Sequence, residues 1–302
     1  MFNNWFTIGN FTIHGYGVMI AVGILFAFWL GEKQAKKYGF NPNEVDNLVF
    51  VCLISGYLCS KLLFCLTNWS DFIQDPLTYL GSSGWVVYGG IIGGVLGAWL
   101  WCRHKKLDFM GYLNLLFPEV ALAQGFGRIG CFFAGCCYGK VTDSRFSLVF
   151  PAGSEAPAGV PLIPTQLISS FGDFVLFYIL YTIYKDSSHR NETAAWYLIL
   201  YSAGRFVVEF FRGDTIRGFI GVLSTSQFIS MFTAAVGVIL LLAVRNQAKK
   251  QMKTAPIIEG TSGKTVTEEK KQEVHDAINA QVEEITAGRK EGESSYENRN
   301  CE

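Results

Sequence analysis

The chain has 302 residues, of which 50% are hydrophobic and only 17% are charged. Acidic and basic residues are equal in number, so the total charge gives no support for a nucleic-acid partner. The apolar excess is typical of a membrane protein. Charge is also unevenly spread, because residues 246–302 hold 11 of the 25 acidic and 9 of the 25 basic residues. We therefore divide the chain into an apolar domain, 1–245, and a polar tail, 246–302.

Seven apolar stretches of the first domain are long enough to cross a bilayer, whose hydrocarbon core of about 30 Å requires about 20 helical residues. They are 11–31, 47–67, 84–102, 113–134, 165–184, 194–212 and 219–244. Backbone groups in lipid must be hydrogen-bonded within their own segment, so we predict an all-α membrane protein with seven transmembrane helices. The tail is predicted to be largely disordered, apart from one amphipathic helix over 266–290.

The basic residues indicate an orientation. Lys and Arg follow the first, third, fifth and seventh stretches, whereas the loop after the second stretch, 67–84, contains neither. Because Lys and Arg collect in cytoplasmic loops, we predict an N-terminus outside the cell and a cytoplasmic C-terminus. The loops after the fourth and sixth stretches then face outward, next to the most unusual polar residues of the chain.

Glycines cluster at the outer end of the third stretch, in WVVYGGIIGGVLG. Small residues allow helices to pack closely, and we assign Gly90, Gly94 and Gly97 to such a contact. Tyr88, just before them, is either an interfacial aromatic anchor or part of a site. Tyr16, at the start of the first stretch, lies at the same predicted surface.

An arginine in apolar company marks the fourth stretch, in GRIGCFFAGCCYGK. Ionisable residues at membrane depth are functional by default, or are paired for structural reasons. Arg128 has no acid close to it on its own helix face, since Glu119 is nine residues earlier. Gly127 and Gly130 leave space around its guanidinium fork, a group that suits a phosphate. The sequence therefore predicts that Arg128 binds an anion.

Three cysteines, Cys131, Cys136 and Cys137, follow this arginine. Paired metal ligands are normally two to four residues apart, and this spacing is different, so we predict neither a metal site nor a cofactor. Packing or a disulfide is favoured over catalysis for these thiols, while a redox function stays an alternative.

The sixth stretch contains a second arginine, in YSAGRFVVEFFRGD. Arg205 and Glu209 are four residues apart and share a helix face, with Tyr201 one turn away in the other direction. This pair either neutralises itself or serves a site. Together the polar residues predict an outward-facing cavity that holds an anionic group at the level of the lipid headgroups, such as a phospholipid.

Residues 11–245 resemble the prolipoprotein diacylglyceryl transferases of bacteria. The segment GRIGCFFAGCCYGK matches the glycine skeleton of the family signature, and YSAGRFVVEFFRGD matches its Tyr…Arg-Phe…Glu-Phe-x-Arg element. PTQL at 164–167 and LSTSQ at 223–227 resemble two further elements, and YGGIIGG at 88–94 resembles a third. These matches follow one another in the family's order.

The resemblance implies transfer of a diacylglyceryl group from phosphatidylglycerol to the lipobox cysteine thiol of an exported prolipoprotein, with release of glycerol phosphate. It implies an enzyme that crosses the bacterial cytoplasmic membrane several times. By the same resemblance, Arg128 binds the headgroup, Arg205 is the second essential cation, Glu209 orients Arg205 and Tyr201 lines the site. Tyr88 stands where the family has a candidate base. The residues expected to bind substrate are Arg128, Gly127, Gly130, Tyr16, Gln166 and Gly90.

The chain departs from the family pattern around this site. The family often has Asn, Asn and Glu where Cys131, Ala134 and Cys136 stand, and His where Tyr88 stands. The proton acceptor for the thiol is therefore open. Three alternatives to lipidation of a prolipoprotein remain: a relative that uses another acceptor, a lipid-binding or transport protein without chemistry, and a thiol redox protein.

Overall fold

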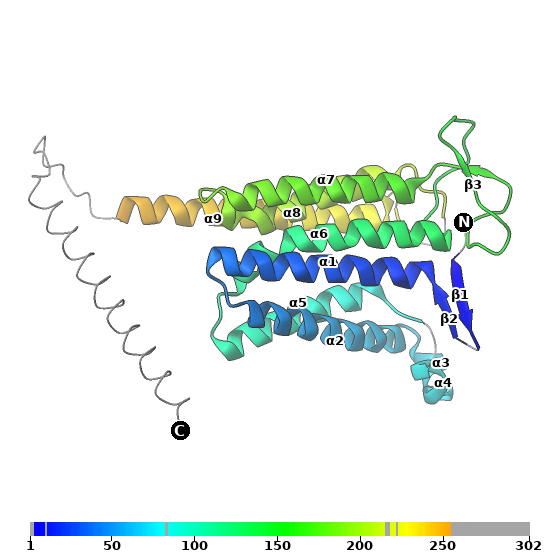
Figure 1. Ribbon diagram of the computed structural model, residues 1–302, viewed down its shortest axis with the longest axis horizontal. Helices are drawn as coiled ribbons and strands as arrows, with labels where there is room; N and C mark the ends of the chain where they lie inside the picture. The colour runs from blue at the N-terminus through cyan, green and yellow to red at the C-terminus, as the bar shows by residue number, and fades with distance from the viewer. Residues whose placement is uncertain (1–2, 10, 82–83, 215–217, 222, 255–302) are drawn as a thin grey trace, which may run out of the picture. The chain divides into compact units, whose positions relative to one another are not determined.

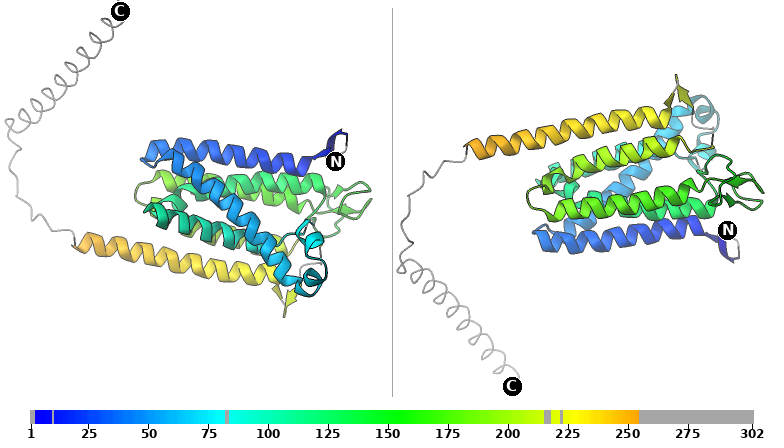
Figure 2. Two further views of the ribbon diagram at one scale, coloured as in Figure 1. Left: turned by 90° about the horizontal axis from the view of Figure 1, so that it is seen from below. Right: turned by 90° about the horizontal axis from the view of Figure 1, so that it is seen from above.

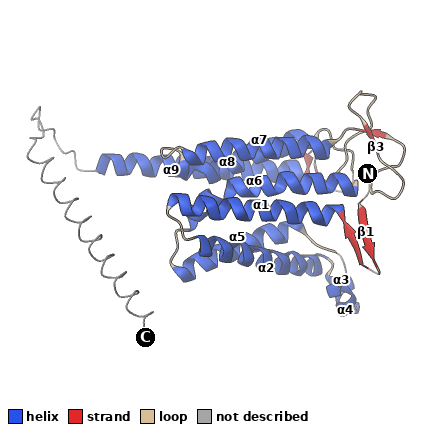
Figure 3. Cartoon of the chain, viewed as in Figure 1, coloured by secondary structure: helices blue, strands red, loops and turns tan. Residues whose placement is uncertain are grey.

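The computed structural model describes residues 3–9, 11–81, 84–214, 218–221 and 223–254, and these residues are mostly helical (Figure 1). The helices are Gly15–Tyr38 (α1), Pro42–Thr67 (α2), Trp69–Gln74 (α3), Pro76–Gly81 (α4), Val87–Lys105 (α5), Phe109–Ala134 (α6), Thr165–Lys185 (α7), Arg190–Glu192 (η1, a 3₁₀ turn), Thr193–Glu209 (α8) and Thr225–Thr254 (α9). Three short hairpins pair Asn4–Ile8 (β1) with Phe11–His14 (β2), Leu148–Val149 (β3) with Pro161–Leu162 (β4), and Phe219–Ile220 (β5) with Leu223–Ser224 (β6) (Figure 3).

Local sequence signals explain where several of these helices begin and end. The side chain of Asn41 accepts a hydrogen bond from the Asn43 backbone at the start of α2, with Pro42 in the first helical position. Gly39 and Gly135 follow α1 and α6 with φ values of 79° and 75°, a left-handed conformation that glycine adopts without steric cost. At both glycines the helix ends and the chain changes direction into the next segment.

Four helices are long and apolar enough to cross a membrane: Gly15–Tyr38, Pro42–Thr67, Thr165–Lys185 and the Thr225–Lys250 part of α9. Less than a third of each apolar window is buried inside the protein, so most of these apolar side chains face outward. Such faces suit lipid contact. The chain is thus a mostly helical membrane protein, as predicted. Each of the seven predicted ranges overlaps one long helix, and the number of membrane crossings stays a prediction.

The helices pack in a chain of close pairs around α6 (Figure 2). Helix α1 packs along α6, α6 packs along α7, and α8 lies against both α6 and α7, while α5 packs mainly on α2. At the α6–α7 contact, Ser170 donates a hydrogen bond to the Gly125 carbonyl at 2.8 Å. Helix α6 is therefore the shared packing partner of α1, α7 and α8, although it contains Pro118 and an arginine.

The glycine cluster of α5 packs as predicted, but in a different register. A Cβ added at Gly89, Gly93 or Gly97 would lie closer than 3.0 Å to α2, whereas Gly90 and Gly94 keep ordinary contact at 3.6 Å. The prediction was right for Gly97 and wrong in making Gly90 and Gly94 the tight positions. The physical reason is the 3.6-residue helical repeat, which places positions 89, 93 and 97 on one face.

The two ends of the helical unit differ. The α1–α2, α5–α6 and α7–α8 connections lie at one end, and the three hairpins with α3 and α4 lie at the other (Figures 1 and 2). At the hairpin end, the Lys140 amide donates to the Phe211 carbonyl at 2.9 Å and the Gly213 amide donates to the Tyr138 carbonyl at 3.1 Å. These bonds tie the segment after α6 to the segment after α8. Helix α9 continues to Thr254, and the predictions for the tail beyond it lie outside the described residues.

Candidate functional site

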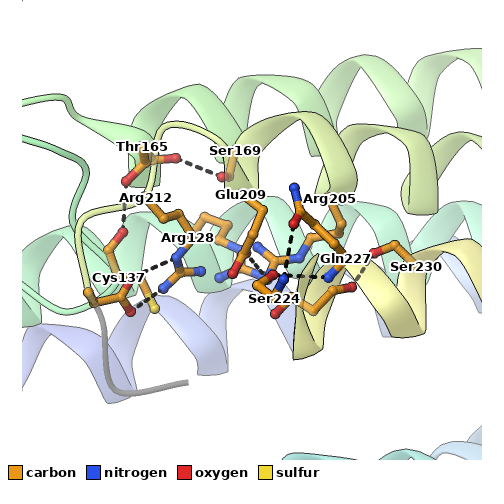
Figure 4. Close-up of polar contacts among 12 residues, drawn as sticks. Arg128, Cys137, Thr165, Ser169, Arg205, Glu209, Arg212, Ser224, Gln227 and Ser230 are labelled. Atoms are coloured by element: carbon orange, nitrogen blue, oxygen red, sulfur yellow. Dashed lines mark hydrogen bonds and ion pairs between the residues drawn. The ribbon is translucent and has the colours of Figure 1, made fainter. Parts of the chain in front are cut away.

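Arg128 of α6 projects into a polar cluster between helices (Figure 4). Its side chain is 20% exposed, and its Nε atom lies 4.0 Å from Oδ2 of Asp173 on α7. This distance is an ion pair but exceeds that of a hydrogen bond. No acid lies close to Arg128 on its own helix face, and the structure supplies one from a different helix.

The second arginine lies in the same cluster. Arg205 Nη2 is 3.8 Å from Oε2 of Glu209 along α8, and both side chains are largely buried. Asp173 interacts electrostatically with Arg205 as well as with Arg128. Tyr201 stacks on Tyr197 with a 5.4 Å separation of ring centroids and an angle of 6°. The structure therefore brings together α6, α7 and α8 through one carboxylate and two arginines.

A third arginine follows α8. The guanidinium of Arg212 forms a bidentate pair with Asp214, with distances of 2.8 and 2.6 Å, and is 7% exposed. Such fork-to-carboxylate pairs fix geometry strongly. Arg212 also interacts with the thiol of Cys137. Arg212 belongs to the motif YSAGRFVVEFFRGD, and no role was predicted for it.

Glycines stand on both sides of Arg128 along α6. A Cβ built at Gly127 would meet no described atom within 4 Å, whereas one built at Gly130 would lie 3.0 Å from the Tyr16 carbonyl. Gly130 thus lets α1 approach α6 closely at Tyr16. Gly127 leaves its own side of α6 free of close contacts with other described elements.

The loop after α6 is held by the start of α7. Thr165 Oγ1 donates to the Cys137 carbonyl and Gln166 Nε2 donates to the Cys136 carbonyl, both at 2.8 Å. Cys137 has a φ of 61°, a left-handed conformation that is strained for a residue other than glycine. The buried Gln166, predicted to bind substrate, therefore holds this loop in place.

The three thiols that follow Arg128 gather at one point. The sulfur atoms of Cys131, Cys136 and Cys137 all lie within 4.8 Å of one another. None of the seven described cysteines forms a disulfide, so of the two favoured roles, packing and a disulfide, the structure leaves packing. Hydrogen bonds with the thiols of Cys131 and Cys136, and then the charge of Arg212, lower the pKa of the Cys137 thiol.

Two predicted site residues belong to α5. Tyr88 is in the first turn of α5 and 41% exposed, and Gly90 contacts Gly56 of α2. Among the described residues, no hydrogen bond or ion pair links Tyr88 to either arginine. The structure thus brings together Arg128, Arg205 and Glu209, whereas the role of Tyr88 and Gly90 stays a prediction.

Three further residues complete the cluster, and no role was predicted for them from the sequence. Asp173 was detectable as a lone carboxylate inside an apolar stretch, which is the same signal that marked Arg128. Ser224 and Gln227 cap α9 reciprocally, with amide-to-side-chain distances of 3.1 and 3.2 Å. Figure 4 places both near Arg205 and Glu209. The LSTSQ element therefore starts the last helix next to the second arginine.

The chain is similar to known proteins over most of its length. The family described as prolipoprotein diacylglyceryl transferase matches residues 3–243. Relatives named phosphatidylglycerol--prolipoprotein diacylglyceryl transferase include one from Clostridium tetani, 44% identical over 235 residues, covering 77% of this chain and 94% of that one. A second, from Clostridium perfringens, is 44% identical over 241 residues, covering 79% and 94%. One from Staphylococcus haemolyticus is 30% identical over 244 residues, covering 78% and 86%. The chain belongs to the prolipoprotein diacylglyceryl transferase family.

Proposed function

We propose that this protein transfers the diacylglyceryl group of phosphatidylglycerol to the cysteine thiol of a prolipoprotein. The family membership and the shared name of the relatives support this activity. The acceptor is the lipobox cysteine of the prolipoprotein signal peptide. The reaction is a displacement at carbon, in which a C–S bond forms, a C–O bond breaks and glycerol phosphate leaves.

The reaction makes two demands on the protein. The acceptor must lose its proton, because the thiolate and not the thiol is the nucleophile. Positive charge must face the departing phosphate, where negative charge grows. Arg128 meets the second demand, since its side chain is 20% exposed while Asp173 stays beyond hydrogen-bonding distance. This combination of partial exposure and a long ion pair is the observation that carries the proposal.

The remaining roles follow from position. Arg205 supplies the second positive charge, Glu209 orients it along α8, and Tyr201 lines the site. Tyr16 and Gly130 shape the wall beside Arg128, and Gln166 holds the loop that closes the site. These assignments are supported by the ion pair within α8 and by the contacts of Gly130 and Gln166.

The proton acceptor is a separate proposal. Tyr88 stands where the resemblance places a base, and Gly90 beside it would contact the substrate near α2. Tyr88→Phe tests the role of the hydroxyl: loss of the alkaline dependence of kcat, with an unchanged KM for phosphatidylglycerol, supports it. An unaltered pH profile assigns the proton to another acceptor, such as a phosphate oxygen of the lipid.

The membrane arrangement is also proposed. We infer seven crossings of the bacterial cytoplasmic membrane, with the N-terminus outside and the tail in the cytoplasm. Basic residues gather at the end that carries the α1–α2, α5–α6 and α7–α8 connections, which supports this orientation. The arginine cluster then lies toward the outer leaflet, where an exported signal peptide is accessible.

The activity is tested with purified protein in detergent, phosphatidylglycerol and a synthetic lipobox peptide. Release of glycerol phosphate together with the matching increase in peptide mass supports the proposal. Lipid turnover that does not require the peptide cysteine indicates another acceptor, and lipid binding without turnover indicates a binding or transport protein. A peptide with serine in place of cysteine is the matched control.

A further inference from the structure

The three thiols beside Arg128 form a preorganised cluster. Their sulfur atoms come from the last turn of α6 and from the two residues after Gly135, and they lie within 4.8 Å of one another. All three cysteines are half-buried, so part of their surface stays exposed. Among the described residues, this is the one group of three or more His, Cys, Asp or Glu side chains with ligand atoms this close.

The backbone of the loop brings the third sulfur back to the other two. Cys137 adopts the left-handed conformation at φ 61°, and such strain in a residue other than glycine often marks a functional site. Hydrogen bonds from Thr165 and Gln166 to the carbonyls of residues 137 and 136 hold this turn. The backbone conformation, and not only the side-chain rotamers, therefore brings the thiols together.

The distances suit a metal with thiolate ligands. A Zn–S bond of about 2.3 Å in tetrahedral geometry separates neighbouring sulfurs by about 3.8 Å. Sulfur atoms already within 4.8 Å of one another reach this spacing through small side-chain rotations. Soft thiolate ligands select thiophilic ions such as Zn²⁺, and three protein ligands leave a fourth position for water or another ligand.

The charges near the thiols favour the bound form. A divalent ion with three thiolates carries one net negative charge, and binding releases three protons to solvent. Arg128 precedes Cys131 by three residues on the same helix face and interacts with its sulfur, while Arg212 interacts with the sulfur of Cys137. Two guanidinium groups thus compensate the charge that the complex gains.

We propose that Cys131, Cys136 and Cys137 bind Zn²⁺ through three thiolates at the edge of the arginine cluster. The spacing of the three cysteines along the chain did not predict such a site, because it says nothing about how the backbone folds between them. The left-handed turn at Cys137 makes adjacent residues converge on one point with a cysteine of the preceding helix.

The test uses the full chain in detergent under a reductant. All proteins carry Cys301→Ser, because Cys301 lies outside the described residues. Zn²⁺ affinity is measured by competition with a chelating dye, and Co²⁺ is added separately to detect sulfur-to-metal charge transfer. The test variant is Cys131→Ser/Cys136→Ser/Cys137→Ser. The matched control, Cys52→Ser/Cys59→Ser, removes two thiols of α2 instead.

One Zn²⁺ per chain, a charge-transfer band, and loss of both in the test variant but not in the control support the site. We expect each single replacement, Cys136→Ser for example, to weaken binding about tenfold or more, which keeps the test valid should the triple variant fail to fold. Equal Zn²⁺ binding by the parent and the folded test variant, or no band with Co²⁺, overturns the proposal. These readouts do not depend on transferase activity, so the two proposals fail separately.

Discussion

Asp173 and Arg128 form an ion pair across the α6–α7 contact, with 4.0 Å between Oδ2 and Nε. The carboxylate also interacts with Arg205 on α8. One acid therefore holds two guanidinium groups in position without engaging Arg128 in a hydrogen bond. This arrangement matters for an anionic substrate, because a closer pair would occupy the donors that a phosphate needs.

The first prediction concerns Arg128. Arg128→Ala removes the guanidinium that faces the departing phosphate, and we expect kcat/KM for lipid transfer to fall by about 10²–10³-fold. Glycerol phosphate release from phosphatidylglycerol measures this loss. Arg103→Ala, at an exposed position near the end of α5, is the control and should keep its activity. Retention of more than about a tenth of the activity by Arg128→Ala would count against its phosphate role.

The second prediction concerns Asp173. Asp173→Asn leaves Arg128 without its buried counter-charge, which should lower the stability of the lipid-free protein by about 3 kcal/mol. An anionic lipid then restores more stability to the variant than to the parent. Thermal unfolding with phosphatidylglycerol, compared with diacylglycerol that lacks the phosphate, measures the difference. Asp143→Asn, at an exposed position, should behave like the parent. Equal shifts for both lipids would contradict the prediction.

The third prediction separates two adjacent glycines of α5. Gly93→Ala places a Cβ 2.6 Å from the Ser55 carbonyl of α2, whereas Gly94→Ala finds its nearest α2 atom at 3.6 Å. Overpacking should cost Gly93→Ala about 1–3 kcal/mol of stability. Gly94→Ala should be neutral or slightly stabilising, because alanine favours helix. Thermal unfolding in detergent decides, and equal midpoints would show that the α2–α5 contact is looser than described.

The fourth prediction is a pH dependence at the opposite end of the unit. Glu192 accepts two hydrogen bonds from Arg245, each of 2.8 Å, and these lower the pKa of its carboxyl below the ordinary value of 4.5; a bond from Trp196 adds to the effect. Because the folded pKa lies below the unfolded one, the pair stabilises the protein fully above the ordinary value. That contribution is lost as the pH falls through the folded pKa. We expect it to be about 1–3 kcal/mol.

Thermal unfolding between neutral pH and acid measures this contribution. Glu192→Gln should be less stable than the parent at neutral pH, and the gap should close as the solution becomes acidic. A gap that is independent of pH would show that Glu192 acts by packing rather than by charge.

The sequence predicted the helices and the residue types of the site better than the contacts between them. The family, the helical membrane class and the apolar stretches were evident from composition and from ordered motifs. The register of α5 was not, because GGIIGG offers two glycine faces with the same spacing. Only the packing against Ser55 and Cys59 selects the face that carries Gly93.

The site was predictable from single helices and not from their neighbours. Arg205 and Glu209 share a helix, so their spacing predicted the pair. Asp173 meets Arg128 from another helix, and a single sequence does not show which helices adjoin. The three cysteines were noted in the sequence, but the convergence of their sulfur atoms was not predicted, since the backbone conformation of Cys137, and not its position in the chain, decides where its sulfur lies.

The backbone bonds between the segments after α6 and α8 constrain how a two-tailed lipid enters. Two backbone hydrogen bonds hold these segments together, one between Lys140 and Phe211 and the other between Gly213 and Tyr138. A lipid cannot pass between the two segments unless these hydrogen bonds break. Because the segment after α8 is hydrogen-bonded to the loop that carries Cys136 and Cys137, a displacement of one segment moves the other. A lipid that displaces the end of α8 would therefore also displace the thiol cluster.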